Sequence, residues 1–224
     1  MITLFCIRRA GEASPPPGLS VPEGGPVRLI EAGELGAWVC DGELPRHLDE
    51  VRAHDAVVRA ALRSSTPLPV RFGTTFADEE ALRRSLQERR EELLAGLRRV
   101  EGKVEMGIRV EWLERDPRAE RPDRSTEATG GRQYLEARRR ELMAAEERRL
   151  RAVALLEAVE RRIGVDAAES LQRPLPAPGV AGVMAHLVQR QGVAHYRARV
   201  EEVRSDFPEV TLHVTGPWAP YSFV

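Results

Sequence analysis

In the second half of the chain, the spacing of hydrophobic residues changes between the period of a strand and that of a helix, in an order that few folds can accommodate. Residues 103–112, KVEMGIRVEW, alternate apolar and polar side chains, which predicts a strand buried on one face. The longest helical pattern follows at 131–163, where Arg and Glu surround an apolar seam that Arg149 interrupts. The segments 180–190 and 210–216 predict two further strands with a helix between them.

A short strand at ESLQRPL, residues 169–175, completes the order strand, helix, strand, strand, helix, strand. This is the order of the split βαβ, or ferredoxin-like, fold. We expect residues 113–129, between the first strand and the long helix, to form a mobile loop, because they contain two prolines and almost no apolar side chains. The seam of the long helix is expected to contain five apolar residues: Leu135, Leu142, Leu156, Val159 and Ile163.

The first part of the chain predicts a smaller α/β unit. Its expected elements are strands at 2–7, 27–31, 37–41 and 67–72 and one helix at 45–65. A further helix is expected at 78–100, with Thr75 and Asp78 resembling a capping box at its start.

The predicted fold class is α+β with two lobes. We expect an N-terminal α/β domain at 1–76, a linking helix at 77–101, and a ferredoxin-like domain with the long charged helix at 102–224.

Charge and composition argue against several classes of partner. The net charge is −1, so no global basic field attracts nucleic acid or an anionic lipid membrane. No apolar run approaches the length of a membrane span. Cys6 and Cys40 are isolated from one another and from any metal-ligand spacing, and no signal peptide is recognised. We therefore expect buried, reduced thiols in a cytoplasmic protein.

The motifs of catalysis are missing from the sequence, and we expect no enzyme activity, no cofactor and no metal. GLRRVEGK, residues 96–103, has five residues between its glycines where a P-loop has four, and it lacks the following Ser or Thr. His47 and His54 would lie two turns apart on a helix, which is too far for one metal, so we interpret both as surface histidines. No GxSxG elbow is present.

The last nine residues, GPWAPYSFV, carry no charge and hold Trp218, Tyr221 and Phe223 close together. Chain ends usually fray, so an aromatic, proline-stiffened end calls for a partner or a core. A second distinctive string is LPVRFGTTF, residues 68–76, in which Leu68, Val70 and Phe72 are expected to face inward along one strand.

These two strings, with GKVEMGIRVEW between them, resemble the gas vesicle GvpF/GvpL family across essentially the whole chain. Ala219 departs from the family, which usually has a second consecutive proline there. The resemblance implies a non-catalytic accessory protein of gas vesicle formation. It would bind the small hydrophobic major shell protein during nucleation or assembly, limit its aggregation, and work with other gas vesicle accessory proteins in the cytoplasm.

The candidate contact residues come from the same two strings, and two interpretations of them stay open. They are Arg71, Phe72, Gly73, Trp218, Pro220, Tyr221 and Phe223. The terminal aromatics either fold back and seal the interface between the two lobes or dock a partner directly. Arg71 is expected to point outward, where it could bind a carboxylate or the chain end. The alternative function is a ferredoxin-like regulatory module that binds a small molecule.

Overall fold

The computed structural model describes residues 1–113, 131–175, 177 and 179–224, and the expected loop at 113–129 therefore lies almost wholly outside the described residues. The chain divides into two compact units. The first comprises Met1–Glu105 together with Pro217–Val224, and the second comprises Met106–Gly216. These bounds differ from the expected domains, because residues 77–105 and the chain end, 217–224, all belong to the first unit.

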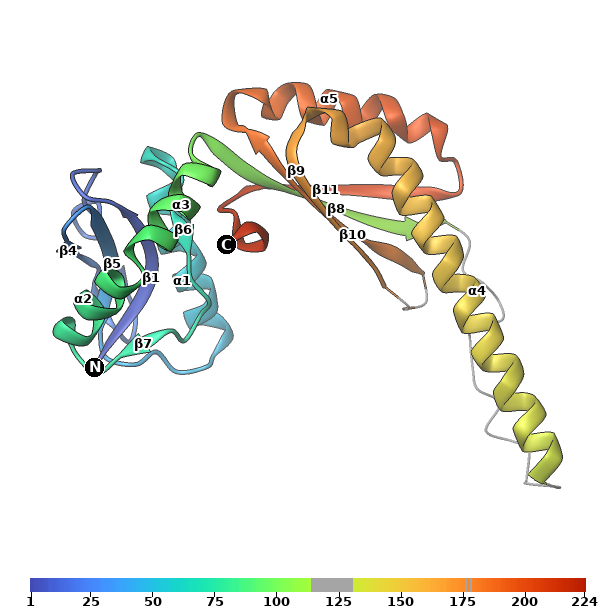
Figure 1. Cartoon of the computed structure of the whole chain (residues 1–224), viewed down its shortest axis with the longest axis horizontal. Helices are drawn as coiled ribbons and strands as arrows, with labels where there is room; N and C mark the ends of the chain where they lie inside the picture. The colour runs from blue at the N-terminus through green and yellow to red at the C-terminus, as the bar shows by residue number, and fades with distance from the viewer. Residues whose placement is uncertain (114–130, 176, 178) are drawn as a thin grey trace. The chain divides into compact units, whose positions relative to one another are not determined.

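A five-stranded sheet forms the first unit, with the order β4-β5-β1-β6 and β7 also paired to β1 (Figure 1). Its strands are β1 (Ile2–Arg9), β4 (Arg28–Ala32), β5 (Leu35–Asp41), β6 (Leu68–Pro69) and β7 (Thr75–Phe76). The short strands β2 (Ser20–Val21) and β3 (Gly25–Pro26) pair separately. The expected strand at 67–72 is thus cut to two residues, because the chain turns away after Pro69.

Helices cover both faces of this sheet. Successive residues of β5 alternate between two core clusters, as the period of a strand requires. Ala37 and Val39 pack in the cluster that includes leucines of α2 (Glu79–Glu88) and α3 (Arg90–Val100). Trp38 and Cys40 pack in the other cluster, with Val57, Val58 and Ala61 of α1 (Leu48–Ser64).

The prediction of a single helix at 78–100 is wrong, because this segment forms two helices that meet at Arg89. The break lets α2 follow β4 while α3 follows β1 and β6. The expected cap is also displaced by three residues. Asp78 is the N-cap, and its carboxylate accepts a 2.8 Å hydrogen bond from the Ala81 backbone, whereas Thr75 lies in β7.

The second unit has the predicted element order, and its four-stranded sheet runs β11-β8-β10-β9, the ferredoxin-like arrangement. Its elements are β8 (Lys103–Trp112, from Met106 onwards), α4 (Gly131–Ile163), β9 (Ala167–Pro174), β10 (Val180–Gln189), α5 (Val193–Val203) and β11 (Val210–Trp218, up to Gly216). The short 3₁₀ turns are η1 (Gly164–Asp166), η2 (Arg190–Gly192), η3 (Arg204–Asp206) and η4 (Tyr221–Phe223).

The alternation that predicted β8 is confirmed, since Val104, Met106, Ile108 and Val110 are each at most 1% exposed. The expected seam of α4 is confirmed only in part. Leu156, Val159 and Ile163 are buried against the sheet, whereas Leu135 and Leu142 are exposed. The first half of α4 runs past the end of its own sheet in Figure 1, and among the described residues the core cluster begins only at Ala152. None of the helices in the described residues has the length and apolar character to cross a membrane.

Candidate functional site

Helix α1 brings together the two strings that the sequence singled out. Its buried face carries His54, and its more exposed side carries Asp55 and, one turn after Asp55, Arg59. His54 faces the turn at residues 70–74, and Arg59 faces the chain end. All these residues belong to the first unit. We refer to the last eight residues, Pro217–Val224, as the tail.

The LPVRFGT string is a strand interrupted by a tight turn. Both the amide and the hydroxyl of Thr74 donate to the Arg71 carbonyl oxygen, at 3.2 and 2.7 Å. Gly73 has φ +83°, a conformation that a side chain would strain, which explains the glycine. On either side of the turn, β6 and β7 both pair with β1. The turn therefore projects from the sheet rather than continuing it.

His54 links α1 to this turn. Its Nε2 lies 3.1 Å from the Val70 carbonyl oxygen, so Nε2 carries the proton and donates it. Its ring packs against Phe5 and edge-on against Phe72, with centroids 5.2 and 5.7 Å away. Burial lowers the pKa of His54, although the hydrogen bond to Val70 opposes the shift. The lowered pKa favours the neutral imidazole in the folded protein.

The expectation that His54 is a surface histidine is therefore wrong, since the residue is 3% exposed. His47, in contrast, is exposed just before α1. The signal that sequence reasoning missed is the position of His54 on the apolar face of the helix, in register with Val58 and Ala61.

The tail is attached to the first unit by polar contacts on both sides of its aromatic residues. The Glu105 carboxylate accepts hydrogen bonds from the Ser222 amide and hydroxyl, at 2.8 and 2.7 Å. Arg99 donates to the Phe223 carbonyl oxygen at 3.0 Å. The Arg59 guanidinium lies 4.3 Å from the centroid of the Trp218 ring and forms an ion pair of 2.6 Å with Asp55.

Burial divides the tail residues into two groups. Ala219, Pro220 and Phe223 are buried, and Ala219 joins the same core cluster as α1. Trp218 is half-buried, and Tyr221 is 38% exposed. Burial raises the pKa of the Tyr221 hydroxyl, and the charge of Asp55 raises it further, so the phenol stays neutral. The exposed aromatic edges therefore carry no charge of their own.

The remaining candidate residues lie at the turn. Phe72 is half-buried and packs on the cluster that also contains Ala219. Arg71 is exposed, and within the described part of the chain its side chain forms no hydrogen bond or ion pair. The structure does not pair Arg71 with a carboxylate or with the tail. The contacts to the tail come instead from Arg59, Arg99 and Glu105, which sequence reasoning did not single out.

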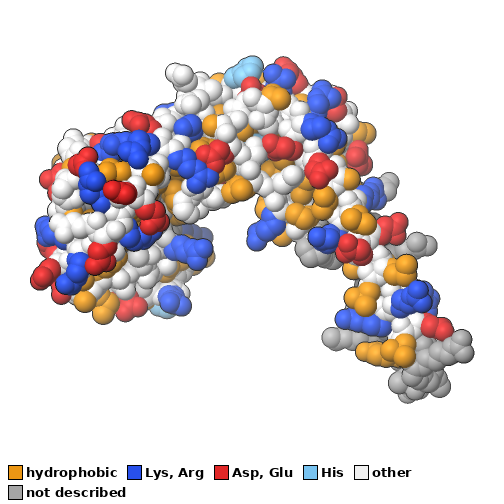
Figure 2. All heavy atoms as spheres, in the orientation of Figure 1, with side chains coloured by type: hydrophobic (Ala, Val, Ile, Leu, Met, Phe, Trp, Pro, Cys, Tyr) orange, Lys and Arg blue, Asp and Glu red, His pale blue; other side chains and the backbone are white. Residues whose placement is uncertain are grey.

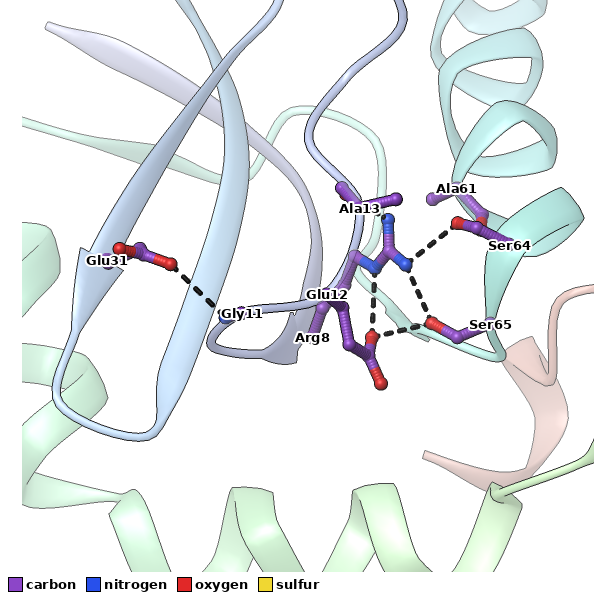
Figure 3. Close-up of polar contacts among 8 residues, drawn as sticks. All are labelled: Arg8, Gly11, Glu12, Ala13, Glu31, Ala61, Ser64 and Ser65. Carbon is purple, nitrogen blue, oxygen red and sulfur yellow. Dashed lines mark hydrogen bonds and ion pairs between the residues drawn. The ribbon is translucent and has the colours of Figure 1, made fainter.

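A second polar cluster surrounds Arg8 at the other end of α1 (Figure 3). The guanidinium is 1% exposed, lies 5.0 Å from the centroid of Trp38, and donates four hydrogen bonds. They go to Glu12, the Ala13 carbonyl oxygen, Ser64 and Ser65. Since Ser65 also donates to Glu12 at 2.6 Å, the cluster satisfies itself and joins β1 to the end of α1.

The second unit contains a hydrogen-bonded chain of three titratable groups, of which His186 and Tyr196 are buried and Glu160 is half-buried. His186 is 0% exposed, with Nε2 2.8 Å from the Glu160 carboxylate and Nδ1 2.5 Å from the Tyr196 hydroxyl. The carboxylate fixes the tautomer, so Nε2–H donates to Glu160 and Tyr196 donates to Nδ1. Burial lowers the pKa of His186 against the opposing effect of Glu160. Each imidazole nitrogen is thus satisfied within the protein.

Two other kinds of chemistry can be assessed from the described residues. Burial raises the pKa of Cys6 to about 12 and of Cys40 to about 11, so neither thiol is activated as a nucleophile. Among residues 1–113, 131–175, 177 and 179–224, no group of three His, Cys, Asp or Glu side chains could hold a metal ion. The arrangement around α1 instead offers uncharged aromatic edges beside charges of both signs.

The chain matches known proteins over nearly all of its length. The family model described as gas vesicle synthesis protein GvpL/GvpF matches residues 2–224. Gas vesicle protein L of Streptomyces sp. (strain CB03234) is 30% identical over 98% of this chain and 91% of its own length. Gas vesicle protein F of the same strain is 27% identical over 89% of this chain and 88% of its own length.

A solved structure has the same fold. The crystal structure of the gas vesicle protein GvpF from Anabaena sp. PCC7120 matches with a TM-score of 0.77 and covers 99% of this chain and 94% of that one. The sequence identity is 14%, so this likeness bears on the fold alone.

Proposed function

Since the chain belongs to the gas vesicle synthesis protein GvpL/GvpF family, we propose that it acts as a non-catalytic accessory protein of gas vesicle assembly. It binds the small hydrophobic shell protein before or during nucleation and limits the aggregation of that protein. Other gas vesicle proteins are its further partners.

The surface around α1 and the tail supports this proposal. Three aromatic residues are partly accessible here: Tyr221 is exposed, and Trp218 and Phe72 are half-buried. Two exposed arginines, Arg59 and Arg71, lie beside them. A shell subunit that faces a gas-filled space must expose apolar surface until it is assembled. Aromatic side chains among mixed charges are the usual composition of a surface that covers such a patch without aggregating by itself.

Buried and exposed tail residues have different parts in this proposal. Ala219 and Phe223 hold the tail in the core of the first unit, whereas Tyr221 contacts the partner. Prolines at 217 and 220 restrict the unfolded tail, so less conformational entropy is lost when it is ordered.

Co-expression with the major shell protein tests the proposal. We expect the chain to increase the soluble fraction of the shell protein and to be recovered with it in a pull-down. Tyr221→Ser should reduce both quantities several-fold, because it removes an exposed aromatic contact. Leu171→Ser, at a 48% exposed position of β9 in the second unit, is the matched control and should leave both unchanged.

The result that contradicts the proposal is a shell protein whose solubility and recovery are the same with and without this chain. A parallel arm that supplies the other gas vesicle accessory proteins distinguishes a chain that acts alone from one that needs them. If Tyr221→Ser and Leu171→Ser behave alike while the parent chain binds, the shell protein binds elsewhere on the chain.

A further inference from the structure

The first half of α4 carries apolar side chains that the described residues of its own unit leave exposed. Leu135, Leu142, Met143 and Leu150 are between 57% and 67% exposed. Figure 2 shows hydrophobic side chains among charged ones along this part of the helix. Isolated exposed apolar residues are ordinary, but these four lie within residues 135–150 on one side of the helix and together form a patch.

These residues lie on one side of the helix with two charged residues between them. At 3.6 residues per turn, Leu135, Arg139, Leu142, Met143, Glu146 and Leu150 fall within about 100° of one another. The buried face further along α4, which includes Leu156 and Val159, is rotated from them by about 130°. The six residues, which we call the α4 strip, are therefore a separate surface and not an overhang of the core seam.

The α4 strip is complementary to a copy of itself that runs in the opposite direction. When the midpoint between Leu142 and Met143 is placed opposite the same midpoint of a second helix, the paired residue numbers add to 285. Leu135 then faces Leu150, Leu142 faces Met143, and Arg139 faces Glu146. In this register every apolar residue of the α4 strip faces an apolar residue, and every charged residue faces one of opposite charge.

The charged pair at the centre of the α4 strip sets the direction of the pairing. In the antiparallel register Arg139 faces Glu146, and both side chains are exposed on the helix. A parallel arrangement in register would place each residue opposite its own kind, so that Arg139 would face Arg139. Charge complementarity therefore selects the antiparallel pairing.

The α4 strip ends just before the core of its own unit begins. Leu150 is its last residue, and Ala152 is the first residue of 134–163 to be buried in that core. Residues 135–150 span about 24 Å at 1.5 Å per residue. The antiparallel pairing therefore uses a part of the helix that the described core leaves exposed.

We propose that two copies of this chain associate through an antiparallel pairing of the α4 strip, residues 135–150, about a two-fold axis between Leu142 and Met143. The interface has eight apolar side chains at its centre and two Arg139–Glu146 pairs across it. A patch of this size belongs to the small, reversible class of protein interfaces, so the association depends on concentration. It involves a different surface from the one proposed for the shell protein.

Sedimentation equilibrium of the full chain tests the proposal directly. We expect the average mass to rise from the monomer towards twice that value as the concentration approaches about 100 μM, where even a weak interface is populated. Leu142→Glu should abolish the rise, since it places a carboxylate on each side of the two-fold axis. Arg148→Glu, on the opposite side of the helix, is the matched control and should keep it.

Charge exchange tests the register. Arg139→Glu and Glu146→Arg should each weaken association at least tenfold, because each places two like-charged pairs across the interface. The double variant R139E/E146R restores both opposite-charge pairs and should recover the parent affinity. A mixture of the two single variants should form a heterodimer, since each supplies what the other lacks.

The mixture separates loss of pairing from loss of helix. Circular dichroism of the single variants shows whether α4 still forms, and a variant that had merely unfolded α4 could not be rescued by mixing. The proposal is overturned if the parent chain stays monomeric up to about 100 μM. It is also overturned if the double variant and the mixture associate no better than the single variants.

Discussion

The Glu105 carboxylate accepts two hydrogen bonds from Ser222, one from the backbone N–H at 2.8 Å and one from the hydroxyl at 2.7 Å. Glu105 lies in β8, and Ser222 lies in the last 3₁₀ turn of the tail. A strand in the middle of the chain therefore sets the position of its end.

Glu105→Gln should loosen the tail. The amide keeps one acceptor oxygen but loses the charge, so at least one hydrogen bond to Ser222 is weakened, at a cost of about 1 kcal/mol. We expect faster trimming by carboxypeptidase and a small fall in melting temperature. Glu101→Gln, at an exposed position four residues earlier, is the control. Equal trimming of the two variants would show that the Glu105 contact does not hold the tail.

Phe223→Ala should destabilise the first unit by about 3 to 5 kcal/mol, because it leaves a cavity at a side chain that is only 3% exposed. Val224→Ala, at a 58% exposed position, should change stability by less than about 0.5 kcal/mol. Urea unfolding monitored by tryptophan fluorescence measures both variants. A Phe223→Ala variant as stable as the parent would mean that the tail is held by its polar contacts alone.

Arg8→Met should be among the most damaging substitutions in the chain. The buried guanidinium donates to Glu12, Ser64 and Ser65, and its removal leaves these groups without their donor at the end of α1. We expect a loss of about 3 to 5 kcal/mol. Arg9→Met, the adjacent half-buried arginine with an ion pair of 3.9 Å, should lose much less. Similar losses for the two variants in urea unfolding would contradict a special role of the Arg8 cluster.

Stability should fall as the pH falls below about 6.5, the ordinary pKa of histidine. Burial lowers the pKa of both His54 and His186 in the folded protein, so the unfolded chain binds more protons in this range. The stabilisation is therefore complete above the unfolded pKa and is lost on acidification. Glu160 and Tyr196 face His186, and Glu160 opposes the shift there.

The free energy of unfolding, measured at about pH 7.5 and about pH 5.5, one unit on either side of the ordinary histidine pKa, checks this dependence. His54→Gln and His186→Gln should each flatten the profile, because glutamine does not titrate. His47→Gln, at an exposed position, should not. A profile that keeps its slope in both buried-site variants would assign the pH dependence to other groups.

The spacing of hydrophobic residues along the sequence predicted most elements of the second unit, but it did not predict which residues contact the tail. The strict alternation at 103–112 and the order of periods after it predicted β8 and the ferredoxin-like arrangement, because a strand buried on one face imposes a period of two on its own sequence. The break at Arg89 left no such trace, since Leu82, Leu86 and Leu93 keep one helical stripe across it.

The candidate site shows the same division. The sequence by itself marked two unusual strings, at 68–76 and 216–224, and predicted that the second needs a partner or a core. Only the tertiary structure decided that α1 lies between them, that His54 is buried, and that Glu105 and Arg99 hold the tail. Hydrophobic period reports which face of an element is buried. It carries no information about which distant element covers that face, because that choice depends on contacts between residues far apart in the chain.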